Sequence, residues 1–255
     1  MGKTQSLNCF SHHAPKLDWM EQYFTFKNEF KEKNTLGSQM FSFFKRFLKD
    51  ADLLDDNGFT RFAEIISDIG LDENLSWALM LANLAYNPQI GWYICNISFG
   101  ETMSKEYVCS MLVDSGADEK WVNDVWSSLA RILDLPFSHV GLGEMVKEKN
   151  KAVALYRTGW QVPDERVILY SLYQFSEKCG NFKQFTLTRL LDTSIESDGI
   201  SPTQIFGLNR DTMEKVLNGL TFNYPDLIEA RFTLGLDNIT LKSNKSAEEI
   251  LNELF

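Results

Sequence analysis

The sequence predicts a mainly α-helical protein with short β-hairpins, in which a winged helix-turn-helix-like N-terminal unit packs on a larger helical domain. Apolar residues recur at helical spacing through most of the 255-residue chain. Short alternating segments beside turn signals predict the hairpins. Near the N-terminus, the order helix, turn, helix, short strand, turn, short strand is that of a winged helix.

Three regions follow from this pattern. Residues 1–18 are predicted to be a flexible leader, and residues 19–70 the winged-helix-like unit. Residues 71–255 are predicted to form a mostly helical domain with a second winged-helix-like unit and a C-terminal β-hairpin plus helix. The chain contains only 15 Gly and 6 Pro, which argues against long linkers.

The clearest helix covers residues 39–50. Its apolar residues recur at i, i+3, i+4, i+7 and i+8, which places them on one face: Met40, Phe43, Phe44, Phe47 and Leu48. The opposite face carries three cations and two uncharged polar residues: Gln39, Ser42, Lys45, Arg46 and Lys49. We therefore expect the phenylalanines to be buried and the cations to be exposed.

The rest of the N-terminal unit is predicted around this helix. Residues 19–34 mix aromatic and charged side chains and favour a helix. Residues 55–58, Asp-Asp-Asn-Gly, are a tight-turn signal between two short strands. Residues 61–69 give another short helix, which ends at Gly70.

The larger domain is predicted from the same two periodicities. Its helices cover residues 72–86, 104–113, 118–133, 164–178, 185–191, 209–220 and 246–254. Its strands cover residues 152–157, 228–234 and 239–241. A polar excursion over residues 142–150 precedes the first strand, so residues 104–157 form the second winged-helix-like unit.

Charge is distributed unevenly. The net charge is −10, which argues against a general nucleic-acid coat because phosphate affinity comes from Lys and Arg. Residues 1–50, however, hold eight Lys and Arg against five Asp and Glu, whereas residues 51–255 have a net charge of −13. A basic surface is therefore expected near the N-terminus.

The polar face of helix 39–50 is the candidate nucleic-acid-binding site. In a recognition helix, such side chains reach phosphates and base edges. The alternative is that Lys45, Arg46 and Lys49 only keep a phenylalanine-rich helix soluble. The helix predicted over residues 118–133 carries more acidic side chains, which favours a structural or protein-binding use of the second unit.

No catalytic centre is predicted. The chain lacks the glycine-rich loops that bind phosphates. His139 is the only histidine beyond the leader, and pairing with Cys109 or Cys179 is the alternative to a structural role. Four carboxylates are candidates for an acid–base pair, although their spacing is that of surface residues: Glu144, Glu148, Glu196 and Asp198.

No metal or other cofactor is predicted either. Cys9, His12 and His13 lack a second ligand pair at a usable spacing. The carboxylates at positions 50, 52, 55 and 56 lack the glycine that a calcium loop needs at its sixth position, so a solvated acidic turn is expected.

The sequence is typical of a cytoplasmic protein. Its four cysteines form no C-x-x-C pair and are interpreted as reduced thiols. The N-terminus is polar, and the most apolar stretch, residues 77–86, is half the length of a membrane span. No membrane partner is expected.

Three stretches resemble a known family. They are residues 36–53 (Leu-Gly-Ser-Gln-Met through Phe-Lys-Arg-Phe-Leu-Lys-Asp-Ala), residues 77–86 with 92–93, and residues 185–191 followed by 199–208 (Gly-Ile-Ser-Pro-Thr-Gln-Ile-Phe-Gly-Leu). They are similar to a domain fused to, or encoded beside, phosphoadenosine-phosphosulfate-reductase-like proteins of bacterial DNA sulfur-modification (phosphorothioation) and phage-defence systems. The similarity covers about residue 30 to the end. This chain lacks the adenylate-binding loop and the iron–sulfur cysteines of the reductase-like half.

The resemblance therefore implies an accessory module rather than a sulfur-transfer catalyst. The leading hypothesis is a non-catalytic accessory protein that binds DNA through a winged helix or docks a reductase-like partner onto DNA. The alternative is a protein-interaction module for such a partner without DNA contact. A more remote alternative is a metal-dependent nuclease or hydrolase that uses scattered carboxylates.

Overall fold

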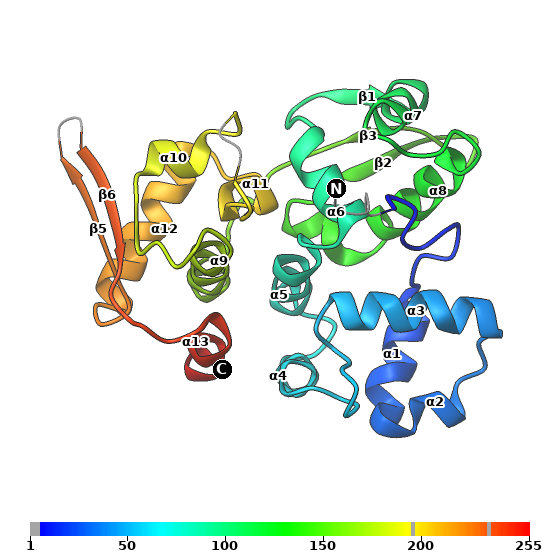
Figure 1. Cartoon of the computed structure of the whole chain (residues 1–255), viewed down its shortest axis with the longest axis horizontal. Coiled ribbons are helices and arrows are strands. Elements are labelled where there is room, and N and C mark those ends of the chain that lie inside the picture. The colour runs from blue at the N-terminus through cyan, green and yellow to red at the C-terminus, as the bar shows by residue number, and fades with distance from the viewer. Residues whose placement is uncertain (1–5, 195–196, 234–235) are drawn as a thin grey trace. The chain divides into compact units, whose positions relative to one another are not determined.

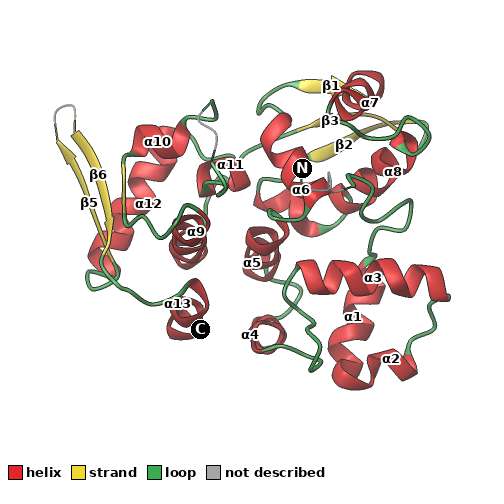
Figure 2. Cartoon of the chain, in the orientation of Figure 1, coloured by secondary structure: helices red, strands yellow, loops and turns green. Residues whose placement is uncertain are grey.

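The structure, a computed structural model, describes residues 6–194, 197–233 and 236–255 (Figure 1). The chain divides into two compact units, Met1–Thr158 and Gly159–Phe255. The boundary expected near residue 70 falls inside the first unit. Helices predominate and the strands are short, as the sequence predicts (Figure 2). No described helix is both long and apolar enough to cross a membrane.

Unit 1 contains these elements: α1 (Leu17–Phe26), η1 (Lys27–Glu29), α2 (Phe30–Lys33), α3 (Ser38–Asp50), α4 (Arg61–Ile69), α5 (Asn74–Leu84), α6 (Pro88–Asn96), β1 (Thr102–Ser104), α7 (Lys105–Asp114), α8 (Val122–Leu133), η2 (Pro136–Val140), β2 (Glu144–Glu148) and β3 (Lys151–Tyr156). Its core surrounds α5, where Trp77 meets Phe137 edge-on, with ring centroids 4.9 Å apart.

The helix predicted over residues 19–34 is interrupted. α1 ends at Phe26, and Lys27 adopts φ 48° and ψ −122°, outside the helical region. The chain then re-enters η1 and α2. A non-glycine residue at this φ is strained, which makes Lys27 a position of interest.

The strands predicted around the 55–58 turn are reduced to a single bridge between Leu54 and Phe59. Longer strands cannot form here, because neighbouring backbone groups are bonded to the two flanking helices. The Leu53 N–H donates to the Leu48 carbonyl at 2.8 Å, which belongs to the end of α3. On the other side, the Thr60 hydroxyl accepts from the Ala63 N–H and caps α4. The expected winged helix at residues 19–70 therefore has no strands around its turn.

A three-stranded antiparallel sheet completes unit 1, in the order β1-β3-β2. The sequence predicts β3 but misses β1 and leaves β2 as a polar excursion. Glu148 pairs with Lys151 across a two-residue turn, Lys149–Asn150, whose φ values are 47° and 64°. Two positive φ values match the turn type that the right-handed strand twist favours.

Gly143 lies just before β2 with φ +107°, and an added Cβ would lie 2.8 Å from the Tyr156 carbonyl oxygen. We expect Gly143→Ala to lower the free energy of unfolding by about 2 kcal/mol or more, since it combines backbone strain with a clash. Gly116→Ala is the control, because its φ of +92° adds strain in open space. Urea unfolding of both variants measures the difference, and equal losses would contradict the clash.

Unit 2 contains α9 (Glu165–Lys178), β4 (Gln184–Phe185), α10 (Leu187–Leu191), α11 (Pro202–Phe206), α12 (Arg210–Asn223), β5 (Ile228–Thr233), β6 (Leu236–Leu241) and α13 (Ala247–Leu254). Its antiparallel sheet has the order β4-β6-β5. Each unit thus pairs its first strand with the last strand of a later hairpin, with helices between them along the chain. Gly207, with φ 64°, turns the chain between α11 and α12.

The predicted flexible leader is packed against unit 1 where the structure describes it. Cys9, Phe10 and Ala14 are fully buried. The Phe10 ring meets Phe47 of α3 edge-on at 6.1 Å, and the Cys9 N–H donates to Gln89 at 3.1 Å. The prediction of flexibility therefore fails for this segment, because its apolar side chains find partners far along the chain. Residues 1–5 lie outside the described residues.

Candidate nucleic-acid interface

Helix α3 has the orientation that its sequence pattern predicts. Phe44 and Phe47 are fully buried, Leu48 is nearly so, and Phe43 and Met40 are half-buried. All five residues of the predicted binding face are exposed: Gln39, Ser42, Lys45, Arg46 and Lys49. The burial of the phenylalanines fixes this orientation, since each contributes roughly 1.5–3 kcal/mol.

Two of the three α3 cations have carboxylate partners. Arg46 Nε donates to Asp50 at 3.5 Å, and Lys49 Nζ donates to Asp56 at 2.5 Å. The Lys49 ammonium lowers the pKa of Asp56. About 40% of the Arg46 and Lys49 side chains stays exposed. Exposed pairs contribute about 0–1 kcal/mol. A phosphate can therefore replace Asp56, which is 93% exposed, on Lys49 at small cost.

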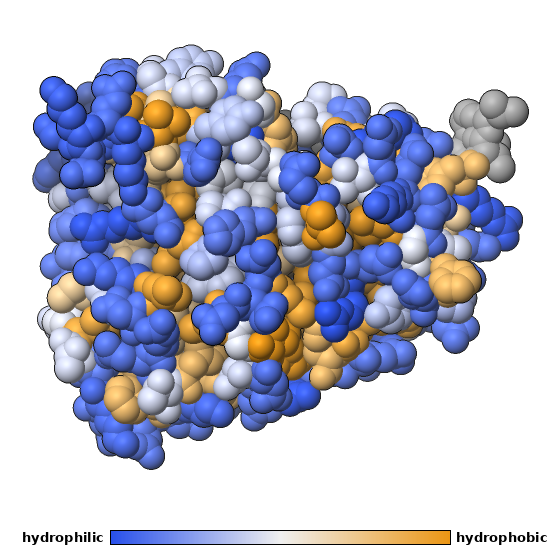
Figure 3. Space-filling view, turned by 180° about the vertical axis from the view of Figure 1, so that it is seen from behind, coloured by the Kyte–Doolittle hydropathy of each residue, from blue (hydrophilic) through white to orange (hydrophobic). Residues whose placement is uncertain are grey.

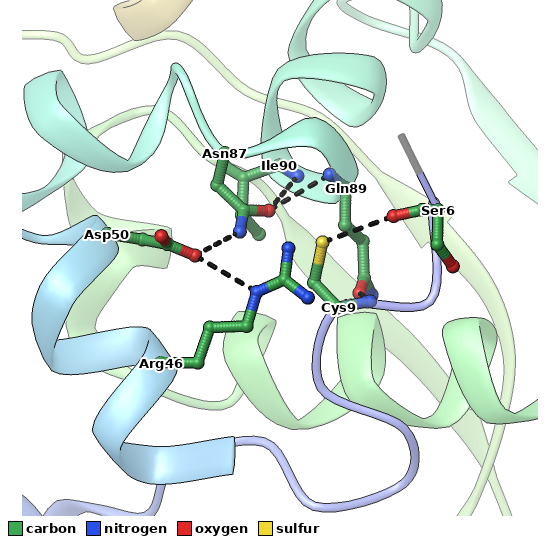
Figure 4. Close-up of polar contacts among 7 residues, drawn as sticks. All are labelled: Ser6, Cys9, Arg46, Asp50, Asn87, Gln89 and Ile90. Carbon is green, nitrogen blue, oxygen red and sulfur yellow. Dashed lines mark hydrogen bonds and ion pairs between the residues drawn. The ribbon is translucent and has the colours of Figure 1, made fainter. Parts of the chain in front are cut away.

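Arg46 belongs to a polar network that connects three segments of unit 1 (Figure 4). Asp50 accepts from Arg46 and also from the Asn87 side-chain amide, at 2.6 Å. Asn87 caps α6 by accepting from the Gln89 and Ile90 N–H groups. Figure 4 shows the Arg46 guanidinium extended toward Cys9 of the leader. Arg46 is thus linked to α6 through Asp50 and Asn87, whereas the leader is bound to α6 through the Cys9 N–H and Gln89.

This network makes a prediction about the Cys9 thiol. Burial raises the pKa of Cys9, and the neighbouring Arg46 charge lowers it by a smaller amount. At pH 8 the buried thiol therefore carries less thiolate than a free cysteine. We expect iodoacetamide to modify Cys9 at least tenfold more slowly than Cys179, which lines a surface pocket of about 390 Å³. Peptide mass spectrometry measures both rates, and equal rates would show that the leader is not docked.

Lys45 lies on a different flank of α3, at a cleft of about 310 Å³. This α3 cleft is bounded by α1, η1, α2, α3 and the 55–58 turn. Three lysines line it, Lys27, Lys31 and Lys45, and all three are exposed. Within the described part of the chain, none of the three forms an ion pair. They form a local positive surface in a chain of net charge −10.

Two carboxylates, Asp55 and Asp56, also line this cleft, and each has a hydrogen-bond partner. Asp55 Oδ1 accepts from the Asn57 and Gly58 N–H groups at 2.7 and 2.9 Å, which closes the turn. Asp56 is the partner of Lys49. Among the described residues, neither forms an ion pair with a cleft lysine, although the pKa of Asp56 is lowered mainly by Lys49 and to a smaller extent by the Lys45 charge. Because three ammonium groups outnumber two carboxylates in the lining, the cleft keeps a net positive charge, which attracts an anionic group.

Sequence analysis missed Lys27 and Lys31 as members of this site. The charge count pointed to them, because both belong to the basic N-terminal 50 residues. Their convergence on Lys45 depends on the break at Lys27, which turns η1 and α2 toward α3. No local periodicity encodes that break.

The candidate catalytic and metal-binding residues do not converge. His139 is exposed, and its partner is Asn74, with 3.3 Å between Nδ1 and Oδ1. Cys179 lies 3.0 Å from the Ser197 hydroxyl. Glu196 lies outside the described residues. In the described part of the chain, no group of three His, Cys, Asp or Glu side chains is placed to hold a metal ion.

The order of the strands and helices in the two units permits comparison with solved structures. The fold is similar to that of SspB. The crystal structure of magnesium ion-bound SspB matches with a TM-score of 0.68 and 14% sequence identity, over 98% of this chain and 88% of that chain. At this identity the likeness to SspB concerns the fold alone. No protein-family model matches the sequence, and no curated protein matches it.

Proposed function

We propose that this chain is a non-catalytic accessory protein that binds double-stranded DNA in the cytoplasm. The contact surface is the exposed face of α3 together with the lysines of the α3 cleft. The observation that carries the proposal is that Lys27, Lys31 and Lys45 line one cleft and, among the described residues, form no ion pair, in a chain of net charge −10. Lysines that neutralise phosphates release counterions, which supplies most of non-specific DNA affinity.

The two sheets support this proposal. A winged helix contains a strand, a helix pair and a closing hairpin, and its strands lie in the order first-third-second. We propose that β1–β3 and β4–β6 belong to such units. The hairpin of unit 1 also carries exposed Lys147, Lys149 and Lys151 beside Glu148. Because a fold does not by itself determine function, the proposed contact residues are those of the α3 cleft.

A reductase-like partner in a DNA sulfur-modification or phage-defence system completes the proposal. It is supported by the sequence resemblance of residues 36–53, 77–86 with 92–93, and 185–191 with 199–208. The magnesium of the SspB structure is not carried over, because the described residues offer it no ligand group of three.

Salt dependence tests the DNA proposal directly. We expect a fluorescein-labelled 20-base-pair duplex to bind the full chain. The logarithm of the association constant K should fall with the logarithm of the salt concentration, with a slope of about −2.7 or steeper. Three phosphate contacts at about 0.9 each give this value. Fluorescence anisotropy between 25 and 200 mM NaCl measures the slope. An absence of binding at 25 mM, or a flat salt dependence, would reject the proposal.

Protein docking is the second candidate function, and the surface of unit 2 favours it. The face of the molecule drawn in Figure 3 is largely hydrophilic, with apolar side chains scattered over it. In unit 2, Phe182 and Phe222 are 69% and 85% exposed, and exposed aromatic residues are enriched at protein interfaces. Docking would be supported if a reductase-like protein copurifies with the chain at 0.5 M NaCl and if Phe182→Ser and Phe222→Ser abolish this copurification. A pull-down that recovers no partner would count against docking.

A further inference from the structure

We propose that the α3 cleft binds one nucleotide, with its phosphate on the three lysines and its base against the apolar wall. The nucleotide is either an unpaired residue of a nucleic-acid strand or a free mononucleotide. This inference deepens the proposed function and rests on it in one respect, since it assigns the same lysines to phosphate contact.

The lining of the cleft has two sides of different chemistry. Lys27, Lys31 and Lys45 supply cations, whereas Phe41 and Leu54 supply half-buried apolar surface. Phe41 rests on the buried Phe30, with ring centroids 6.1 Å apart and ring planes tilted by 31°. A planar base can pack on such a wall, because every base has an apolar face.

The size of the cleft sets the scale of the ligand. Its volume of about 310 Å³ is at the lower end of the range of roughly 300–1,000 Å³ for small-ligand sites. Smooth duplex backbone would contact the lysines at the rim but would leave the apolar wall unused. An unpaired nucleotide uses both sides at once.

The polar groups in the cleft allow an anion to approach. The Asn28 side-chain oxygen accepts from the Phe59 N–H at 2.8 Å, which directs that oxygen to the backbone. Asp55 accepts from the Asn57 and Gly58 N–H groups but keeps its negative charge, so the anion must lie nearer to the lysines than to Asp55. Gly58 has φ +117°, and a Cβ there would collide with Asn28, so the turn stays close to the 27–29 segment.

The backbone of Lys27 is the second, independent indication. At φ 48° and ψ −122° it adopts a conformation that glycine tolerates at far lower cost. The side chain of Lys27 makes no ion pair within the described chain, and its ammonium lies 5.4 Å from the Phe59 ring centroid. Strain of this kind collects at binding sites, because function rather than stability selects the residue.

Lys27→Gly separates function from stability. We expect this variant to unfold at equal or higher urea concentration than the wild type, since the strain is relieved. It should nevertheless bind a single-stranded oligonucleotide at least threefold more weakly. A variant that loses stability and keeps its affinity would overturn the assignment of Lys27.

The base contact is tested with Phe41→Leu and the matched control Phe43→Leu, both half-buried on α3. The probes are a ten-nucleotide single strand with one central 2-aminopurine, the corresponding duplex, and adenosine monophosphate, each with the full chain. We expect Phe41→Leu to weaken single-strand binding about tenfold and to reduce the 2-aminopurine fluorescence change. Phe43→Leu should alter neither.

The outcomes separate the two proposals. If Phe41→Leu leaves single-strand affinity and fluorescence unchanged while the duplex still binds, the nucleotide site is rejected and the DNA proposal stands. If the single strand or adenosine monophosphate binds and the duplex does not, the nucleotide site stands and the proposed duplex binding fails. Binding of adenosine monophosphate that Lys27→Gly and Phe41→Leu both weaken identifies a free mononucleotide as the ligand.

Discussion

Replacing Lys27, Lys31 and Lys45 together by Glu is expected to weaken duplex binding by roughly 100-fold at 50 mM salt. Each ammonium accounts for about one released counterion, so the slope of log K against log salt should become shallower by about 2.7. All three side chains are exposed, and folding should change little. Anisotropy titrations of the wild type and the triple variant at several salt concentrations measure both effects.

A charge-matched control separates a local contact from overall repulsion. Lys178, Lys183 and Lys215 are lysines of unit 2, and changing all three to Glu gives the same net charge as the cleft variant. The affinity of this control variant for the duplex should fall by less than about threefold. Equal losses in both triple variants would mean that net charge, and not the α3 cleft, determines binding.

Phe47→Ala is expected to lower the free energy of unfolding of unit 1 by about 3–5 kcal/mol, the range for truncating a buried phenylalanine. Phe47 of α3 is fully buried. Its ring contacts Phe10 of the leader, Phe44 of α3 and Phe137 of η2. The truncation leaves a cavity that these three rings cannot fill without moving. The leader should loosen as well, so Cys9 should become reactive toward iodoacetamide.

Urea unfolding followed by tryptophan fluorescence measures this effect, read from the transition that belongs to unit 1. Tyr107→Ala is the control, because Tyr107 is 58% exposed on α7 of the same unit. Its loss should stay within about 0.5 kcal/mol. A loss below 1 kcal/mol for Phe47→Ala would contradict the account of how α3 is oriented.

The sequence predicts the long amphipathic helices well, because burial enforces their period. The α3 pattern gave the buried and exposed faces, and the helix predicted over residues 61–69 coincides with α4. The strand predicted over residues 228–234 corresponds to β5, and the one predicted over residues 239–241 is the second half of β6, which already begins at Leu236. In each of these elements the local pattern and the tertiary packing favour the same conformation.

The rest could not be predicted, for reasons specific to each element. β1, β4 and α11 are two to five residues long and too short to show a period. The leader is polar in sequence but contributes Cys9 and Phe10 to the core through contacts far along the chain. The strands expected beside the 55–58 turn do not form, because the residues before the turn bond to the end of α3 and Thr60 after the turn caps α4. Lys27 and Lys31 line the α3 cleft only because the helix breaks at Lys27.

Lysine footprinting of the full chain tests the central claim most directly. Brief acetylation with and without a 20-base-pair duplex, followed by peptide mass spectrometry, reports the protection of each lysine. The account predicts that Lys27, Lys31, Lys45 and Lys49 become at least fivefold less reactive, while Lys178 and Lys215 do not change. Protection of Lys147, Lys149 and Lys151 with full reactivity at Lys27, Lys31 and Lys45 would contradict it and place the DNA on the β2–β3 hairpin.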